Sequence, residues 1–205
     1  MARKTRSETM AETRQKLLST GRELFGTVGY AETVMDDLTA KVGLTRGALY
    51  HHFGDKKGLF LAVLQALDAD MDARLADISE QASDPWQAFQ RRCRAYLEMA
   101  TEPEVQRIML RDAASVLAAE QLQAMQLNCV ASIAGMLDAM MQQGLIPPAS
   151  PQMLARFING GLTETALWIA HSEDAPTALT EALAGLEVWL AGLVAARAAS
   201  LSVPE

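Results

Sequence analysis

The sequence predicts an all-α protein, with a three-helix module at the N-terminus and a larger helical body, about nine helices in total. Apolar residues recur three and four positions apart, and no segment alternates as a strand would. Half of the 205 residues are hydrophobic, enough for a sizeable core. Residues 1–58 carry ten Lys or Arg against seven Asp or Glu, whereas residues 59–205 carry eight against eighteen. We therefore expect a basic domain at 1–58 and an acidic domain at 59–205.

Two helices are predicted before residue 43. The first has an apolar face and ends near Gly29, a residue suited to the left-handed position after a helix. Its face comprises Leu17, Leu18, Leu24, Phe25 and Val28. The second begins where Thr33 to Asp36 match a capping box, and Gly43 ends it.

The third and fourth predicted helices follow directly. Thr45 has the character of an N-cap for a short helix that runs to about Phe53, and Asp55 has the same character for the next helix. The fourth helix has a continuous apolar stripe: Phe60, Val63, Leu64, Leu67, Met71, Leu75 and Ile78. At about 1.5 Å per residue, such a helix is long enough to connect two domains.

Proline positions mark the helix starts in the body. Asp84-Pro85, Glu102-Pro103 and Ser150-Pro151 each place Pro at a first helical position. Gly144 and Pro147-Pro148 separate a long helix from the helix that begins near residue 151.

The two short helices around residues 43–45 form a helix-turn-helix arrangement, in which the second helix lies in the major groove of DNA. Leu49 and Phe53 share a face that packs inward. The other side carries Gly47, Ala48, Tyr50 and His51, and its small residues let the backbone approach the bases closely.

Charged and capping groups around this helix favour the same interpretation. Arg46 reaches far enough to contact a guanine edge or a phosphate. Helix starts capped by Thr33 and Thr45 offer N–H groups to phosphates, and Lys56 and Lys57 can hold the flanking backbone. The module is therefore predicted to bind DNA.

Other classes of function are less consistent with the sequence. His51 and His52 diverge by about 100° on a helix, and the third histidine, His171, lies in another segment, so we expect no metal site. Cys93 and Cys129 suggest neither a disulfide framework nor a zinc cluster. No spacing indicates a nucleophile or paired acids, so we expect neither an enzyme nor a cofactor. The alternative is a helical interaction protein whose basic N-terminus binds a partner protein.

The run LTRGALYHHFGDK, residues 44–56, resembles the signature of the tetracycline-repressor (TetR) family of transcriptional regulators, and the resemblance is specific over residues 13–60. It implies that DNA is faced by Thr33, Thr45, Arg46, Gly47, Tyr50, His51 and Lys56. Lys57 stands where an acidic residue is usual, which adds positive charge.

The resemblance also implies a ligand pocket in the body, walled by the fourth to eighth helices. Aromatic and Met side chains there suit a hydrophobic or amphipathic effector. The residues that we expect to line it are Met71, Trp86, Phe89, Cys93, Tyr96, Met125, Asn128, Cys129 and Phe157.

By the same resemblance, the last two helices pair with those of a second copy in a four-helix bundle. The expected interface comprises Phe157, Gly160, Gly161, Trp168, Leu183, Leu186, Trp189 and Leu190. A two-fold dimer requires a roughly palindromic operator. Polar residues interrupt the longest uncharged stretch, and no apolar segment follows the basic N-terminus, so we expect a cytoplasmic protein without a membrane span. The expected function is a transcriptional regulator, a repressor released from its operator by the ligand.

Overall fold

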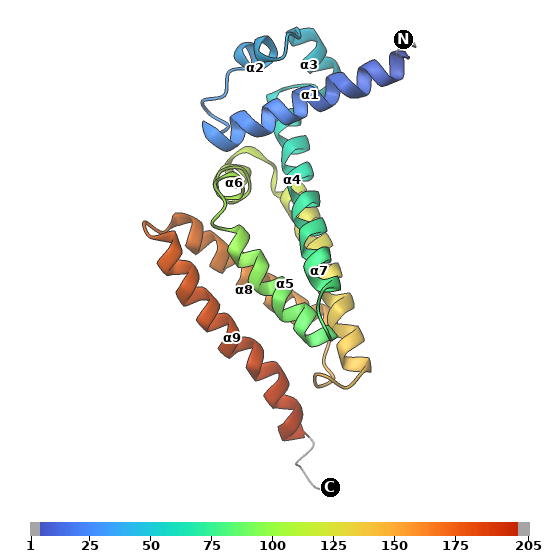
Figure 1. Cartoon of the computed structure of the whole chain (residues 1–205), viewed down its shortest axis with the longest axis vertical. Coiled ribbons are helices and arrows are strands. Elements are labelled where there is room, and N and C mark those ends of the chain that lie inside the picture. The colour runs from blue at the N-terminus through green and yellow to red at the C-terminus, as the bar shows by residue number, and fades with distance from the viewer. Residues whose placement is uncertain (1–4, 201–205) are drawn as a thin grey trace. The chain divides into compact units, whose positions relative to one another are not determined.

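A computed structural model describes residues 5–200, with side chains to residue 194, and every regular element in that range is helical (Figure 1). The all-α prediction is therefore confirmed. The elements are α1 (Arg6–Thr27), α2 (Met35–Lys41), α3 (Arg46–Phe53), α4 (Lys56–Glu80), α5 (Pro85–Met99), η1 (Val105–Asp112), α6 (Ala113–Val116), α7 (Ala119–Gln142), α8 (Pro151–His171) and α9 (Ala175–Ser200).

The chain forms two compact units. The first contains the chain up to Asp70 together with Pro103–Ala118, and the second contains Met71–Glu102 together with the chain from Ala119 onward. The first unit also includes the start of α4 and the η1–α6 segment, both beyond the module expected at residues 1–58, and η1 packs against α1.

The core of the first unit is apolar and partly aromatic. Buried leucines from α1, α2 and α3 meet there: Leu17, Leu38 and Leu49. The ring of Phe25 lies edge-on to that of Phe60 with centroids 5.2 Å apart, and Tyr30 contacts both rings. This cluster fixes the helix-turn-helix against α1 and the start of α4.

Most predicted helix ends are confirmed. Gly29 follows the C-cap of α1 with a φ of 88°, which an L side chain rarely adopts. The Thr45 hydroxyl accepts from the N–H of Ala48 at the start of α3, and an Asp55 carboxyl oxygen accepts from the N–H of Gly58 at 2.6 Å. Asp84 and Ser150 cap α5 and α8, each directly before a proline.

The capping box predicted at Thr33 is wrong. Helix α2 begins at Met35, and its N-cap is Val34, which makes no side-chain cap. The hydroxyl of Thr33 instead donates to the carbonyl of Gly29 at 2.7 Å, and the residue is only 4% exposed. The carbonyl left at the end of α1 is thus satisfied by the residue that was expected to start α2.

The helix predicted to start at Pro103 does start there, but Val105–Asp112 form a π-helix. Hydrogen bonding from i to i+5 brings Arg107 and Asp112 onto adjacent turns. Arg107 donates to the carbonyl of Val28 at 2.8 Å, and Asp112 accepts from the N–H of Tyr30 at 2.7 Å. Both ends of η1 are therefore fastened to the turn after α1.

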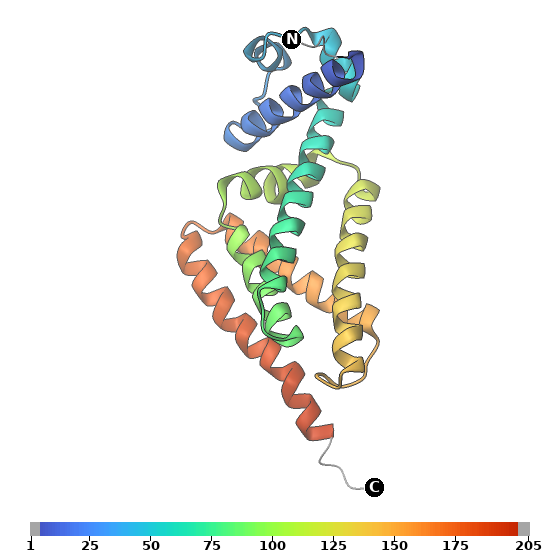
Figure 2. The ribbon, with the colours of Figure 1, turned by 45° about the vertical axis from the view of Figure 1, so that its right-hand side comes forward.

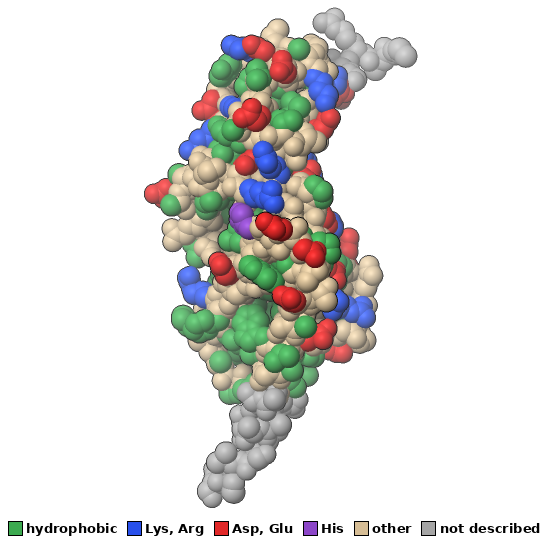
Figure 3. All heavy atoms as spheres, turned by 90° about the vertical axis from the view of Figure 1, so that its left-hand side faces the viewer, with side chains coloured by type: hydrophobic (Ala, Val, Ile, Leu, Met, Phe, Trp, Pro, Cys, Tyr) green, Lys and Arg blue, Asp and Glu red, His purple; other side chains and the backbone are tan. Residues whose placement is uncertain are grey.

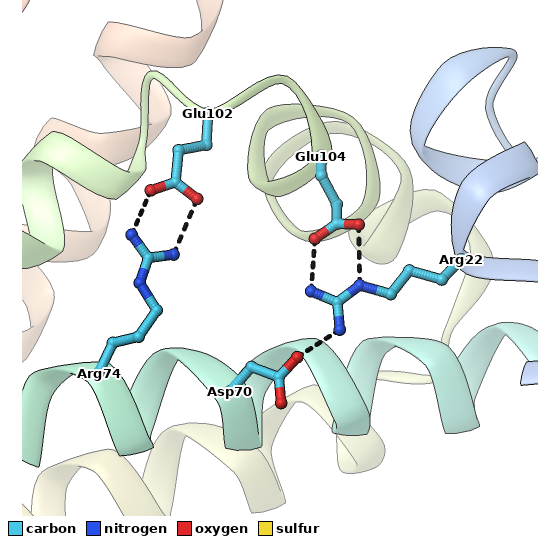
Figure 4. Close-up of polar contacts among 5 residues, drawn as sticks. All are labelled: Arg22, Asp70, Arg74, Glu102 and Glu104. Atoms are coloured by element: carbon cyan, nitrogen blue, oxygen red, sulfur yellow. Dashed lines mark hydrogen bonds and ion pairs between the residues drawn. The ribbon is translucent and has the colours of Figure 1, made fainter. Parts of the chain in front are cut away.

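Arginine–carboxylate pairs occur in each unit (Figure 4). In the first, Arg22 of α1 binds Glu104 and Asp70. In the second, Arg74 of α4 binds both carboxylate oxygens of Glu102.

The second unit contains the end of α4 together with α5, α7, α8 and α9, and α7 packs against α8 (Figure 2). Its core includes Phe89, Leu137, Ile158 and Ile169, all buried. A Cβ at Gly161 of α8 would lie 3.1 Å from the Trp189 ring of α9, so the two helices approach each other closely at this glycine.

Candidate nucleic-acid interface

One side of α3 is exposed and the other is built into the core. Arg46, Gly47, Tyr50 and His51 are exposed at positions i, i+1, i+4 and i+5, which share one helical face. Leu49 is fully buried on the opposite side. The helix thus presents four of the residues predicted to face DNA on a single surface.

The neighbouring histidines differ in their surroundings. His51 is exposed, whereas His52 is half-buried, and their ring centroids lie 5.5 Å apart. Ala48 is also half-buried, and its N–H donates to the hydroxyl of Thr45. Among residues 5–194, no group of three His, Cys, Asp or Glu could hold a metal ion.

Arg46 is not a solitary cation. Its Nε and Nη2 donate to the two carboxylate oxygens of Asp36, which lies in the first turn of α2. This pairing raises the pKa of Arg46, so its charge is retained. Asp36 is absent from the predicted set, because its distance from Arg46 depends on how α2 meets α3.

Lys56 and Lys57 are placed differently. The ammonium of Lys56 donates to the carbonyl of Ala31 at 3.2 Å and lies 4.5 Å from the Tyr30 ring centroid. Burial lowers the pKa of Lys56. Lys57 is exposed. Lys56 therefore supports the turn before α2, a role that the sequence analysis missed.

The residues predicted to line a ligand pocket differ in how deeply they are buried. Met71, Phe89 and Cys93 are buried, Trp86, Tyr96, Met125 and Cys129 are half-buried, and Asn128 and Phe157 are exposed. Burial raises the pKa of the Cys93 thiol to about 12.

A groove of about 430 Å³ lies elsewhere in this unit, between α5, α8 and α9. It is lined by Leu97, Gly161, Leu162, Thr165, Trp168, Glu181, Ala182, Gly185, Leu186 and Trp189.

The residues predicted for a dimer interface fall into two groups. Phe157, Trp168 and Trp189 are exposed, and Gly160 has open space where a Cβ would stand. Gly161 and Leu183 are half-buried, whereas Leu186 and Leu190 belong to the core of the single chain.

Apolar side chains also gather on the surface of α8 and α9 beyond the predicted set. Met153 and Val188 join Phe157, Trp168 and Trp189 there, and Figure 3 shows hydrophobic side chains clustered on this side of the second unit. By length and composition alone, α7 and Ala175–Val194 of α9 could cross a membrane, a weak criterion that the helices of soluble proteins also meet.

Two family models match the chain. Residues 17–63 match one described as "Bacterial regulatory proteins, tetR family", and residues 86–193 match one described as "Tetracyclin repressor-like, C-terminal domain". The first match spans α2 and α3, and therefore the exposed face described above.

Individual relatives agree. A TetR-family transcriptional regulator of known crystal structure from Pectobacterium atrosepticum is 52% identical, with a TM-score of 0.83 over 93% of this chain and 98% of that chain. The HTH-type transcriptional regulator AcrR of Shigella flexneri is 38% identical over 71 residues, 35% of this chain and 33% of that protein. The Transposon Tn10 TetC protein of Escherichia coli is 22% identical over 165 residues, 80% of each chain. The chain thus spans about a third of the AcrR relative in that match.

Proposed function

The chain belongs to the TetR family of bacterial transcriptional regulators, which bind DNA, and from this membership we propose that it is a homodimeric repressor. Two copies of α3 enter successive major grooves of a roughly palindromic operator. A small hydrophobic or amphipathic ligand bound in the second unit releases the operator. The protein acts in the cytoplasm, where its DNA target is.

The exposed face of α3 is the observation that carries DNA recognition. Arg46, Tyr50 and His51 supply hydrogen-bond donors, and Gly47 lets the backbone come near the base edges. Thr33 is left out of the contact set because its side chain is buried. Lys57 offers its whole ammonium group to phosphate, whereas Lys56 keeps the two N–H donors that Ala31 does not use.

The apolar surface of α8 and α9 supports the homodimer. Phe157 is 66% exposed and Val188 is 76% exposed, more than a monomer in water would favour for side chains grouped on one face. Self-association through this surface would bury both residues, and a two-fold dimer uses the same surface of each copy.

The second unit offers space for an effector. The groove of about 430 Å³ falls within the usual range of small-molecule sites and carries Thr165 and Glu181 among mainly apolar residues. It shares Trp168 and Trp189 with the surface proposed for the dimer, so a ligand in this groove would bind next to the interface of the two copies. The predicted lining residues between α5 and α7 remain a second candidate location. A ligand in either place acts by population shift, stabilising a form of the dimer whose recognition helices no longer match the operator.

Selection of DNA from a random-sequence pool tests the proposal. We expect purified protein to enrich a sequence with two-fold symmetry, and two chains to bind each duplex. A reporter gene placed behind that sequence should be transcribed less when the protein is present. Enrichment of no sequence would contradict operator binding, and increased transcription would contradict the repressor role.

The effector is tested separately, with a panel of apolar and amphipathic compounds. A true effector should raise the melting temperature by mass action and weaken the duplex complex by the same coupling free energy. A compound that stabilises the protein without weakening DNA binding is no inducer.

A further inference from the structure

The ion pair between Asp36 and Arg46 decides which donors of the arginine remain available. A guanidinium carries five N–H groups in a rigid plane. Asp36 takes the Nε–H and one N–H of Nη2. Both hydrogens of Nη1 and the second hydrogen of Nη2 are left, and one hydrogen of each nitrogen points outward at the outer edge of the group.

This outer edge matches the acceptors of a guanine. Nη1 and Nη2 of an arginine donate together to O6 and N7 in the major groove, the commonest base-specific contact. The side chains of Arg46 and Asp36 are each 57% exposed, so the edge is open to solvent. A phosphate accepts the same two donors, and the chemistry alone does not choose between them.

We propose that Asp36 is a positioning residue, which fixes the plane of the Arg46 guanidinium so that its outer edge reads one guanine in each half of the operator. The inference rests on the operator binding proposed above. A carboxylate at this place repels phosphates and so lowers affinity for all DNA. In return it restrains the arginine from swinging onto the backbone, where it would carry no sequence information.

A role in folding is a poor explanation for the pair. Ion pairs between exposed side chains contribute about 0–1 kcal/mol. Asp37, the next residue of α2, is likewise exposed and acidic, and it lies in the same first turn. Among the described residues no hydrogen bond or ion pair of Asp37 is observed. It therefore provides a control with the same charge in the same helical turn.

The experiment compares Asp36→Ala with Asp37→Ala. The probes are the duplex that the wild-type protein selects from a random pool and a scrambled duplex of the same composition. Dissociation constants for both are measured at one salt concentration, together with melting temperatures. Arg46→Ala, the double variant of positions 36 and 46, and Asp36→Glu complete the set.

We expect both alanine variants of α2 to bind the scrambled duplex more tightly, because each removes a negative charge. Only Asp36→Ala should lower the preference for the selected duplex, by about tenfold. The lost preference should be confined to one G·C pair in each half-site. Arg46→Ala should lose its preference at the same pair. Asp36→Glu should recover part of the preference, and adding Asp36→Ala to Arg46→Ala should cause no further loss.

Equal behaviour of Asp36→Ala and Asp37→Ala would overturn the positioning role and leave the proposed function intact. Equal weakening of both duplexes by Arg46→Ala would also overturn it, because the arginine would then hold a phosphate. A pool that yields no enriched sequence would instead contradict the proposed function.

Discussion

Arg22 and Glu104, which are 82 positions apart in the chain, form a two-pronged ion pair with Nε–Oε2 and Nη2–Oε1 distances of 2.8 and 2.6 Å. The pair joins α1 to the start of the η1 segment inside the first unit, and both side chains are partly shielded from water. The hydrogen bonds that Arg22 donates to Glu104, and then to Asp70, raise the pKa of Arg22 above its usual value. Arg22 therefore keeps its charge over the whole physiological range.

Glu104→Gln is expected to destabilise the protein by roughly 1–2 kcal/mol, because the amide replaces one charge-assisted acceptor and leaves Arg22 underpaired. Urea unfolding measures this change. The matched control is Glu23→Gln, which breaks an ion pair with Lys41 between exposed side chains. That change should cost less than about 0.5 kcal/mol. Equal losses of unfolding free energy in the two variants would show that the shielded ion pair stabilises the protein no more than the exposed one.

Gly47→Ala should separate DNA binding from folding. A Cβ there would meet only Thr45 Oγ1, at 3.6 Å, which is ordinary contact. The melting temperature should hold or rise, since Ala favours a helix over Gly by up to about 1 kcal/mol. The added methyl should crowd the close approach of the α3 backbone to the base edges. It should therefore weaken the complex with the selected duplex by about 1–3 kcal/mol, the usual cost of overpacking a tight contact.

Gly29→Ala provides the contrast for that variant. Gly29 has a φ of 88°, and a Cβ there would collide with the Arg107 guanidinium. Its substitution should lower the melting temperature of the free protein, while Gly47→Ala should not. A drop in melting temperature for Gly47→Ala would mean that its effect on DNA binding reports folding.

Salt dependence should distinguish the two neighbouring lysines. Each phosphate neutralised contributes about −0.9 to the slope of log affinity against log salt concentration. Lys57→Ala should make that slope shallower without changing the melting temperature. Lys56→Ala should also lower the melting temperature, because the carbonyl of Ala31 and the Tyr30 ring lose the ammonium. A Lys56→Ala variant that melts like wild type would contradict its supporting role.

Local signals predicted most helix ends, because a cap depends on residues within one turn. Gly29, Thr45, Asp84 and Ser150 each end or begin a helix as their types indicate. The prediction that Thr33 caps α2 is wrong. The Thr33 hydroxyl donates a hydrogen bond to the carbonyl of Gly29, four residues earlier. A capping box needs the Thr33 oxygen as an acceptor at the N-cap position of the helix, but α2 begins one residue later, with Val34 as its N-cap.

The features that could not be predicted from the sequence depend on contacts between residues far apart in the chain. Nothing in VQRIMLRD indicates a π-helix, since the contacts of Arg107 and Asp112 with residues 28–30 depend on the tertiary fold. The face of α3 was predictable because Leu49 fixes which side is buried. The partner of Arg46 was not, because Asp36 reaches it across the turn between two helices.

The two cysteines should differ in reactivity. Burial raises the pKa of Cys93 from 9.0 to about 12, so almost none of it is thiolate at pH 8. Cys129 is only half-buried. Iodoacetamide should label Cys129 first, as mass spectrometry of peptides would show, and Cys93 only after unfolding.

The same shift links Cys93 to stability at high pH. The thiol keeps its proton in the folded protein, whereas in the unfolded chain it ionises above its ordinary pKa of 9.0. Its contribution to stability is therefore complete below about pH 9 and is lost as the pH rises toward 12. Cys93→Ala should flatten this part of the stability profile. Rapid labelling of Cys93 in the native protein would contradict its burial.

Phe157→Arg should convert the proposed dimer into a folded monomer. The ring is 66% exposed in the single chain, so the arginine disturbs no core, but it places a charge in the apolar surface through which we propose that two copies pair. Light scattering should change from twice the 22.2 kDa chain mass to that mass itself. Leu127→Arg on α7 is the control, because Leu127 is 44% exposed and lies outside the surface of α8 and α9. When dimerisation is lost, the affinity for the duplex with two half-sites should fall by about 10²-fold or more. The reason is that the second DNA-binding unit is no longer tethered close to the second half-site. A Phe157→Arg protein that stays dimeric would place the interface elsewhere.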